Sequence, residues 1–334
     1  MIRAPKFWTG DGWLARALAP LSTIVAAVTN RRLAQTGWLS PVPVICCGNA
    51  TVGGAGKTTL TLDLARRLTA RGISVHILSR GYGGLARGPR RVRQGDTAAI
   101  TGDESLLLAG AAPTWTGPDR AASAREAIAA GAEVLLMDDG LQNPSLVKTM
   151  SLLVVDGQSG FGNGRVLPAG PLREPPGTAA ARCRAVVLIG RDSTGALARL
   201  PSRVPVLRAD LVQCDEVAEL IGRRILAFAG IAHPGKFFSG LERAGAILAD
   251  REVFADHHVF SASELSRLEA RARTLDAVLV TTPKDAVRLP AGMAVRVVGV
   301  RLVWESEAEI ETLLDEHISG WLPNSPPDRR PSMA

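Results

Sequence analysis

Residues 42–72 read VPVICCGNATVGGAGKTTLTLDLARRLTARG, and this stretch decides the fold class. Residues 42–48 are almost entirely apolar, as expected of a strand that is buried on both faces. Residues 58–72 favour a helix and end on Gly72, a residue type that often follows a helix C-terminus. A glycine-rich turn joins the two parts. Strand, turn and helix in this order predict the start of a βαβ unit.

The turn, residues 51–58, reads TVGGAGKT and predicts a phosphate-binding loop. The usual pattern, G-x-x-x-x-G-K-[ST], begins with glycine, and this chain has Thr51 there. Glycines let backbone N–H groups approach phosphate oxygens, and the helix N-terminus adds the positive end of its dipole. Lys57 is predicted to reach the β- and γ-phosphates of ATP, and the Thr58 hydroxyl to bind Mg²⁺. The alternative is a glycine-rich turn with a chance Lys-Thr pair. The predicted nucleotide-binding residues are Thr51, Val52, Gly53, Gly54, Ala55, Gly56, Lys57 and Thr58.

A second chemical signal follows another apolar run, in EVLLMDDGLQN. Asp138 and Asp139 stand where that predicted strand ends. A carboxylate at this place in a nucleotide-binding sheet holds Mg²⁺ directly or through water. The alternative is that the two aspartates only cap the next helix, a position that aspartate favours. Together with the phosphate loop, the pair predicts a site for ATP and Mg²⁺.

Other short apolar runs alternate with helical stretches along the chain. This alternation predicts an α/β fold of the P-loop NTPase type, with a doubly wound and mainly parallel sheet. Hydrophobic residues make up 46% of the chain and aromatic residues only 4%, which suits buried parallel strands covered by helices. The further predicted strands are residues 73–79, 134–139, 152–156, 185–190, 225–231 and 277–282.

The length of 334 residues predicts more than one small domain. We expect an N-terminal amphipathic helix at the membrane interface in residues 1–40 and a P-loop kinase core in residues 41–220. A second, smaller α/β lobe is predicted for residues 221–322, followed by a disordered tail in residues 323–334. The Gly/Pro-rich stretch 160–177 has the composition of a linker between lobes or of a substrate-binding loop.

Two polar clusters stand where a hydrophobic core would not hold them. Asp103 and Glu104 begin a predicted helix in ITGDESLLLAG, and Asp256, His257 and His258 occur together in FADHHVFS. A carboxylate paired with an imidazole can take a proton from an alcohol. The same residues can also serve only as helix caps. Spacing alone leaves both interpretations open.

The cysteines indicate a reduced, cytoplasmic protein. No pair of them has C-x-x-C or another metal-ligand spacing. Cys46 and Cys47 lie in the apolar run before the phosphate loop, where cysteine behaves as a small buried hydrophobe. The remaining two are Cys183 and Cys214.

The formal charge of +7 and the isoelectric point near 9.8 are compatible with nucleic acid, an anionic membrane or a phosphorylated substrate. The distribution of charge favours the membrane, because residues 1–40 carry a net +4. The same segment contains three of the six tryptophans, Trp8, Trp13 and Trp38. Its charged residues are Arg3, Lys6, Arg16, Arg31 and Arg32 against Asp11.

An apolar stripe at helical spacing accompanies these basic residues and predicts a helix with a kink at Pro20. Basic ends, tryptophans and an apolar stripe are typical of a helix that lies in a membrane interface. The run is shorter than the roughly 20 residues needed to span a bilayer, and it lacks the cleavage site of a signal peptide. The alternative is a helix packed on the main domain. The stripe consists of Leu14, Leu18, Leu21, Val25 and Val28.

Eight segments, in order along residues 42–290, together resemble one family, the tetraacyldisaccharide 4'-kinases of lipid A biosynthesis. The resemblance implies ATP-dependent phosphorylation of the 4'-hydroxyl of an acylated glucosamine disaccharide 1-phosphate. It also implies a peripheral protein at the cytoplasmic face of a Gram-negative inner membrane, whose partners are this lipid and the anionic membrane surface but no nucleic acid. The segments are GNATVGGAGKTT, LSRGYGG, TGDESLLLA, LMDDGLQN, GFGNGRVLPAGPLREP, FAGIAHPGKFF, FADHHVFS and TTPKDAVRL.

The family's functional residues carry over by position. Lys57 corresponds to the lysine that binds the ATP phosphates, and Asp103 to the acidic residue that acts as base for the sugar hydroxyl. The partner of Asp103 is the histidine after Asp256, so His257 is favoured over His258. The predicted metal-binding residues are Thr58, Asp138, Asp139 and Glu104.

Thr51 is normal for this family, but two positions depart from its pattern. Leu141 and Asn143 replace an aromatic residue and a histidine, and Pro283 stands where glutamate is common. We expect these changes to tune activity. One rival function is a partitioning or metal-insertion NTPase, although such proteins have lysine where this chain has Val52. The other rival is a nucleotide-gated membrane adaptor without catalysis.

Overall fold

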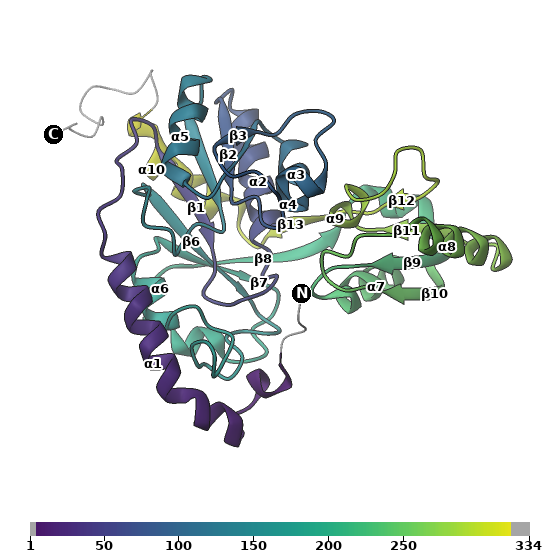
Figure 1. Ribbon diagram of the computed structural model, residues 1–334, viewed down its shortest axis with the longest axis horizontal. Coiled ribbons are helices and arrows are strands. Elements are labelled where there is room, and N and C mark those ends of the chain that lie inside the picture. Colours follow the sequence, from purple (N-terminus) through teal and green to yellow (C-terminus); the bar gives the residue numbers. More distant parts are fainter. Residues whose placement is uncertain (1–4, 322–334) are drawn as a thin grey trace.

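The phosphate loop follows the central strand of a large sheet in the computed structural model, which describes residues 5–321. The sheet has nine strands in the order β13-β8-β7-β6-β1-β5-β2-β4-β3 (Figure 1). β1 (Val44–Gly48) lies between β5 (Val134–Asp138) and β6 (Met150–Asp156), parallel to both. Only the two edge strands pair in antiparallel fashion. The predicted doubly wound, mainly parallel sheet is therefore confirmed.

The remaining strands of this sheet lie on either side of the central three, and helices cover both faces (Figure 1). The strands are β2 (Val75–Ser79), β3 (Arg90–Arg91), β4 (Thr114–Thr116), β7 (Ala185–Ile189), β8 (Val206–Gln213) and β13 (Val300–Trp304). The helices are α1 (Trp13–Leu33), α2 (Lys57–Ala70), α3 (Ala98–Thr101), α4 (Asp103–Ala109), α5 (Arg120–Ala129), α6 (Pro176–Ala181) and α10 (Glu307–Ile318).

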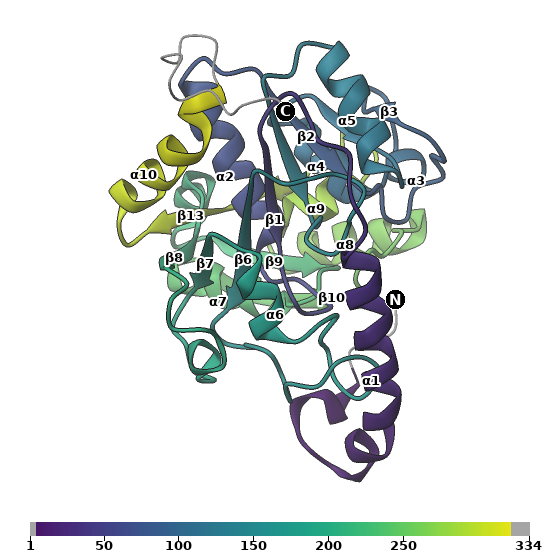
Figure 2. The ribbon, with the colours of Figure 1, turned by 90° about the vertical axis from the view of Figure 1, so that its left-hand side faces the viewer.

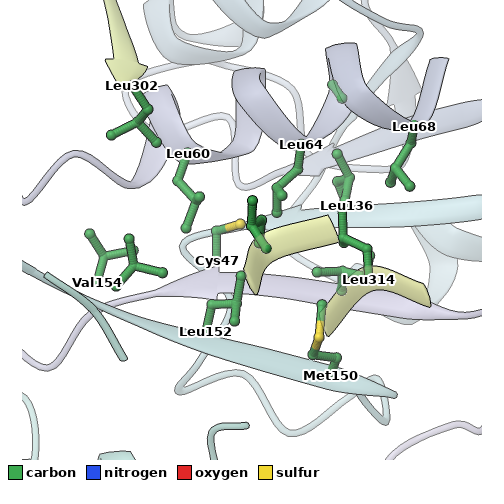
Figure 3. Close-up of a cluster of buried hydrophobic side chains, with 14 of the residues drawn as sticks. Cys47, Leu60, Leu64, Leu68, Leu136, Met150, Leu152, Val154, Leu302 and Leu314 are labelled. Carbon is green, nitrogen blue, oxygen red and sulfur yellow. The ribbon is translucent and has the colours of Figure 1, made fainter. Parts of the chain in front are cut away.

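One face of the sheet packs on α2 and α10. Leu60, Leu64 and Leu68 recur every four residues on α2, so they share one helix face, and all three are fully buried (Figure 3). Cys47 lies in this cluster, and Cys46 lies in the cluster on the opposite face of the sheet. Burial raises the pKa of the Cys46 thiol to about 11. Both cysteines are therefore structural, as predicted.

A second lobe is inserted between β8 and β13. It contains a parallel sheet in the order β10-β9-β11-β12 with helices beside it (Figure 1). Its strands are β9 (Arg224–Ala229), β10 (Ile247–Val253), β11 (Val278–Thr281) and β12 (Arg296–Val297), and its helices are α7 (Pro234–Arg243), α8 (Ala262–Thr274) and α9 (Pro283–Ala286).

The predicted lobe boundary at residue 322 needs correction. After β12 the chain returns to the large sheet, where β13 pairs with β8 and α10 packs beside α2. The sequence did not indicate this pairing, because β8 and β13 are separated by the whole second lobe and the pairing of such distant strands leaves no local pattern. The predicted tail 323–334 and Arg3 lie outside the described residues.

The stretch 160–177 is not a linker between lobes, because it lies inside the first lobe, between the end of β6 and the first residues of α6. It packs against the N-terminal helix. The Ser22 hydroxyl donates to the Val166 carbonyl at 2.6 Å and accepts from the Ala169 N–H at 3.3 Å. The Trp8 indole N–H donates to the Pro168 carbonyl at 3.1 Å.

α1 therefore packs on the main domain with one face and is exposed on another. Ala15 and Ser22 are its buried residues, and Pro20 lies inside the helix. The predicted stripe is divided between the two faces: Leu14, Leu18 and Val25 are half-buried, whereas Leu21 and Val28 are exposed. Within residues 5–321, no helix is long and apolar enough to cross a membrane.

Candidate functional site

The phosphate loop owes its shape to glycines with left-handed backbone conformations. Gly56, the residue before α2, has φ of 91°, and a Cβ there would lie 2.5 Å from Ile189 Cδ1. Gly53 has φ of 118°. The Lys57 ammonium reaches back to the Gly53 carbonyl at 3.4 Å and so lies over the loop. The loop and the start of α2 form a cradle of backbone N–H groups that suits phosphate oxygens.

The second lobe lies against this loop. A Cβ on Gly54 would come within 3.5 Å of the Ala232 side chain, which belongs to the FAGIAHPGKFF segment. Nearby, Lys236 of α7 donates to Asp156 Oδ2, at the end of β6, at 2.6 Å. The two lobes therefore meet at the phosphate loop.

Asp138 lies beside the first turn of α2. Its carboxylate accepts from the Thr58 hydroxyl at 3.2 Å and from the Thr61 hydroxyl at 3.1 Å. Burial raises the pKa of the Asp138 carboxyl to about 7, and the negative charge of Glu104 adds to the shift. The charge of Lys57 opposes this rise. A threonine hydroxyl next to a strand-end carboxylate is the arrangement that holds Mg²⁺ in nucleotide sites of this kind.

The raised pKa of Asp138 predicts how stability depends on pH. Because the folded-state pKa exceeds the ordinary value of 3.8, the folded protein holds a proton between about pH 4 and 7 that the unfolded chain has lost. Ionisation in this window therefore lowers stability as pH rises. Between about pH 5 and 7.5, nucleotide-free wild type should lose roughly 2 kcal/mol of unfolding free energy relative to Asp138→Asn. Urea denaturation at both pH values measures this difference.

The control for this experiment is Asp210→Asn, which removes an exposed carboxylate from β8. It should follow the wild-type dependence on pH. Parallel pH profiles for wild type and Asp138→Asn would show that the carboxyl does not titrate in this range.

Asp139 is held by a different partner. Arg173 Nη1 donates to Oδ1 at 2.8 Å and Nη2 to Oδ2 at 3.0 Å, a two-pronged pair. Lys57 Nζ lies 3.7 Å from Oδ1. Burial favours the neutral acid, but Lys57 and Arg173 outweigh it and hold the pKa of Asp139 below its usual range. The Asp139 carboxylate thus holds the side chains of Lys57 and Arg173 beside the phosphate loop.

Arg173 reaches this position because its loop pairs with the phosphate loop. The Val52 N–H donates to the Pro171 carbonyl at 2.8 Å, and the Arg173 N–H donates to the Ala50 carbonyl at 2.7 Å. The sequence placed Arg173 only in a possible substrate loop. Arginine recurs among glycines and prolines in this stretch, and that composition was the available signal for a functional role of Arg173. Nothing in the neighbouring sequence indicated that Asp139 is the partner of Arg173.

The two polar clusters of the sequence meet across the lobes. Asp103 Oδ2, at the start of α4, lies 2.7 Å from His257 Nδ1 in the second lobe. Gly102 precedes α4 with φ of 82°, and a Cβ there would lie 2.5 Å from the Tyr82 carbonyl, so only glycine fits. His257 itself has a left-handed φ of 60°. Left-handed backbone conformations raise the conformational energy of residues other than glycine, and they occur most often at functional sites.

Lys284 completes this cluster, and the sequence analysis missed it. Its ammonium lies 3.2 Å from His257 Nε2, 3.2 Å from Asp256 Oδ1 and 3.4 Å from Glu104 Oε1. Burial opposes its charge, but Glu104, Asp256 and Asp103 outweigh burial and raise the pKa of Lys284. An ammonium can only donate, so His257 Nε2 accepts and Nδ1 carries the proton that it donates to Asp103. The motif TTPKD was the available signal for this lysine.

Burial opposes ionisation of Asp103, but His257, Lys284 and Arg288 outweigh it and keep its pKa below the ordinary value. Asp103 is therefore a carboxylate at neutral pH. Its Oδ1 accepts the Glu104 backbone N–H at 2.8 Å, and a carboxylate retains acceptor capacity beyond two such bonds.

His258 is engaged elsewhere. Its Nε2 lies 3.1 Å from both carboxylate oxygens of Glu264, and its ring stacks on Phe254 with centroids 4.8 Å apart. Glu264 also caps α8 together with Ser261. Of the two histidines, only His257 contacts Asp103.

The residues predicted to bind metal do not form one cluster. No group of three or more His, Cys, Asp or Glu side chains in residues 5–321 could hold a metal ion. Thr58 and Asp138 are adjacent, whereas Asp139 pairs with Arg173 and Glu104 with Lys284. Because Mg²⁺ usually takes one or two carboxylates plus substrate phosphates, Thr58 with Asp138 still fits this ion.

The positions that depart from the family pattern have structural roles. Leu141 is a buried core residue, and the Asn143 side chain accepts from the Ser145 N–H and hydroxyl in a turn. Pro283 occupies the first position of α9, after Thr282 as cap. Proline is favoured there because that N–H has no helical partner.

Comparison with known proteins agrees with this geometry. Residues 14–319 match the family model for tetraacyldisaccharide-1-P 4'-kinase, LpxK. A tetraacyldisaccharide 4'-kinase of Gluconacetobacter diazotrophicus is 56% identical over 94% of this chain and 98% of its own. One from Rhodospirillum centenum is 51% identical over 96% and 98%. The crystal structure of "apo" form LpxK from Aquifex aeolicus in complex with ATP superposes with a TM-score of 0.73, at 26% identity over 91% of this chain and 99% of that one. These findings confirm the resemblance.

Proposed function

The chain belongs to the tetraacyldisaccharide 4'-kinase family, and on that premise we propose which of its residues perform the reaction. The reaction transfers a phosphate from ATP to the 4'-hydroxyl of an acylated disaccharide 1-phosphate in lipid A biosynthesis. The observation that carries the proposal is the 2.7 Å contact between Asp103 and His257. Asp103 in this pair can serve as the base that a kinase for an alcohol requires.

On the donor side, the loop of residues 51–58 binds the triphosphate of ATP through backbone N–H groups. Lys57 neutralises charge on the β- and γ-phosphates, and Asp139 with Arg173 orients Lys57. Thr58 and Asp138 would hold Mg²⁺, which neutralises charge on the phosphate oxygens when it is bound. Positioning and charge neutralisation supply most of the acceleration in phosphoryl transfer.

On the acceptor side, Asp103 takes the proton from the 4'-hydroxyl as that oxygen attacks the γ-phosphorus in line. The bond from the γ-phosphorus to the β–γ bridging oxygen breaks, and ADP leaves. A carboxylate with a lowered pKa is a weak base, which suits a loose transition state in which the proton leaves late. His257 donates to Asp103 and fixes its orientation. Lys284 in turn holds the ring tautomer of His257. These two act through Asp103 and so position it.

The proposal is tested with γ-labelled ATP and the acylated disaccharide 1-phosphate. Label should appear in the lipid. Release of free phosphate without labelled lipid would favour a partitioning or metal-insertion NTPase instead. Binding of ATP without any turnover would favour the nucleotide-gated adaptor.

We further propose that the enzyme works as a peripheral protein at the cytoplasmic face of the inner membrane, with α1 lying in the interface. An exposed apolar face of α1 supports this location. Trp13, Leu21, Ile24 and Val28 follow helical spacing on that face and are all at least half exposed. The opposite face already packs on the first lobe through Ser22.

The double variant Ile24→Ser/Val28→Ser should weaken binding to lipid vesicles by about tenfold or more, because it removes apolar area from the inserted face. Vesicle cosedimentation measures the change. Ile221→Ser/Ile247→Ser removes comparable exposed side chains from the second lobe and should bind as wild type does. Equal losses in both variants would argue against insertion of α1.

A further inference from the structure

The positive charge of this protein is concentrated in two segments. Residues 1–40 carry a net +4, and residues 80–102 carry five arginines against one aspartate, also a net +4. The whole chain has +7, so all the remaining residues together carry −1. The second segment, here called the arginine segment, connects β2 to α4 and includes β3 and α3. Its charge is as large as that of the N-terminal segment.

Most of these arginines are free to bind an external anion. Arg90 pairs with Asp96, the single acidic residue of the segment. Arg87, Arg91 and Arg93 are exposed, and none of them forms a side-chain ion pair with a residue in the described range 5–321. Guanidinium groups bind phosphate oxygens in two-pronged fashion and desolvate readily. Unpaired exposed arginines therefore favour a phosphate-bearing partner.

Exposed apolar side chains stand among these arginines. Leu85 is 79% exposed and Ile100 is 36% exposed. Backbone hydrogen bonds of 3.0 Å from Leu85 to Ala99 and of 3.1 Å from Ala86 to Ile100 bring them together. A patch that combines arginine with exposed aliphatic side chains is typical of a membrane interface and less so of a nucleic acid site.

The arginine segment shares one side of the molecule with α1. Figure 2 shows α1, β3 and α3 along the same, right-hand side. The segment also borders Asp103 and His257, here called the acceptor pair, because the Tyr82 ring lies 5.7 Å from the His257 ring. A helix that lies in the interface can still roll about its own axis. A second contact beside the acceptor pair would stop that rotation.

We propose that the arginine segment is a second membrane-binding surface, which binds the phosphate groups of anionic phospholipids through Arg87, Arg91 and Arg93 while Leu85 enters the interface. With α1 it forms a two-point attachment that turns the Asp103–His257 pair toward the bilayer. This orientation rests on the proposed function, in which the acceptor is an acylated lipid held in that bilayer.

The experiment uses the full chain and vesicles of phosphatidylcholine with or without phosphatidylglycerol. Each basic residue near an anionic surface strengthens binding by about fivefold. Arg87→Gln/Arg91→Gln/Arg93→Gln should therefore lower partitioning onto phosphatidylglycerol vesicles by roughly 100-fold. The difference in partitioning between this variant and wild type should decrease as the salt concentration is raised, because salt screens the charges. Leu85→Asn should weaken binding by several-fold even at high salt, where charge is screened.

The matched control is Arg223→Gln/Arg243→Gln/Arg273→Gln, which removes three exposed arginines from the second lobe and gives the same net charge. It should bind as wild type does. The proposal is overturned if the arginine-segment variant keeps wild-type binding, if the control loses as much, or if wild type prefers duplex DNA to the vesicles.

Vesicle binding needs no turnover, so this result is independent of the proposed function. Phosphate transfer to acceptor dispersed in neutral detergent micelles is measured in parallel. It should be unchanged in the arginine-segment variant, because the three arginines do not contact the reacting groups. If the wild-type protein transferred no phosphate in micelles, the kinase function would be contradicted. The vesicle-binding result would still decide whether the arginine segment binds membranes.

Discussion

Lys57→Met is expected to lower turnover by about 10³-fold, because it removes the cation that neutralises charge on the transferred phosphate. Methionine keeps most of the side-chain length and leaves no large cavity. The change also leaves Asp139 with one cation, Arg173, in place of two. The phosphate loop should keep its shape, since Gly53 and Gly56 set it. Steady-state kinetics with saturating ATP and lipid acceptor measure the loss.

The control for this experiment is Arg66→Met, which removes a cation from the same helix. Arg66 is exposed and pairs with Asp63, away from the loop. Its turnover should stay near wild type, and both variants should melt near the wild-type temperature. Turnover of Lys57→Met within a few-fold of wild type would rule out the proposed role of Lys57.

Asp103→Asn is expected to lower turnover by about 10²–10⁴-fold, the range over which general bases act. The amide has nearly the same shape, so ATP affinity should change little. The donor residues Lys57, Thr58 and Asp138 are untouched. Rapid-quench measurement of the chemical step, together with equilibrium ATP binding, separates the two effects. A variant that loses ATP binding as much as turnover would indicate a structural role for Asp103.

The two adjacent histidines provide a sharp companion test. His257→Asn should reduce turnover by about 10–100-fold, because Asp103 loses its orienting donor. His258→Asn should keep turnover close to wild type, since His258 contacts Glu264 and Phe254 instead. Equal effects from both substitutions would contradict the assignment of His257 as the partner of Asp103.

Local sequence was sufficient for the donor half of the site. The phosphate loop depends on glycines, a lysine and a threonine within eight consecutive residues, so its geometry is set by short-range backbone preferences. The uniformly apolar strands that flank it can only be buried on both faces. Asp138 and Asp139 follow one of those strands directly. These features were therefore sufficient to predict the fold class and the ATP site from the sequence alone.

The acceptor half depended on the fold. Asp103 and His257 are 154 residues apart, and Lys284 comes from a third segment. Each had a credible role as a helix cap or surface charge, and only the approach of the two lobes brought the three side chains into contact. Resemblance to a family favoured His257, but the contacts of His258 with Glu264 and Phe254 supply the physical reason.

The sequence by itself determined a phosphate loop, its strand-end aspartates and a basic, amphipathic N-terminus, because each is encoded by neighbouring residues. The tertiary structure alone decided that Arg173 meets Asp139, that Lys284 holds His257, and that β13 returns to the large sheet. It also decided which face of α1 is exposed and that the arginine segment lies on the same side. These are pairings between distant segments, and such pairings are set by the packing of whole elements, which no local pattern records.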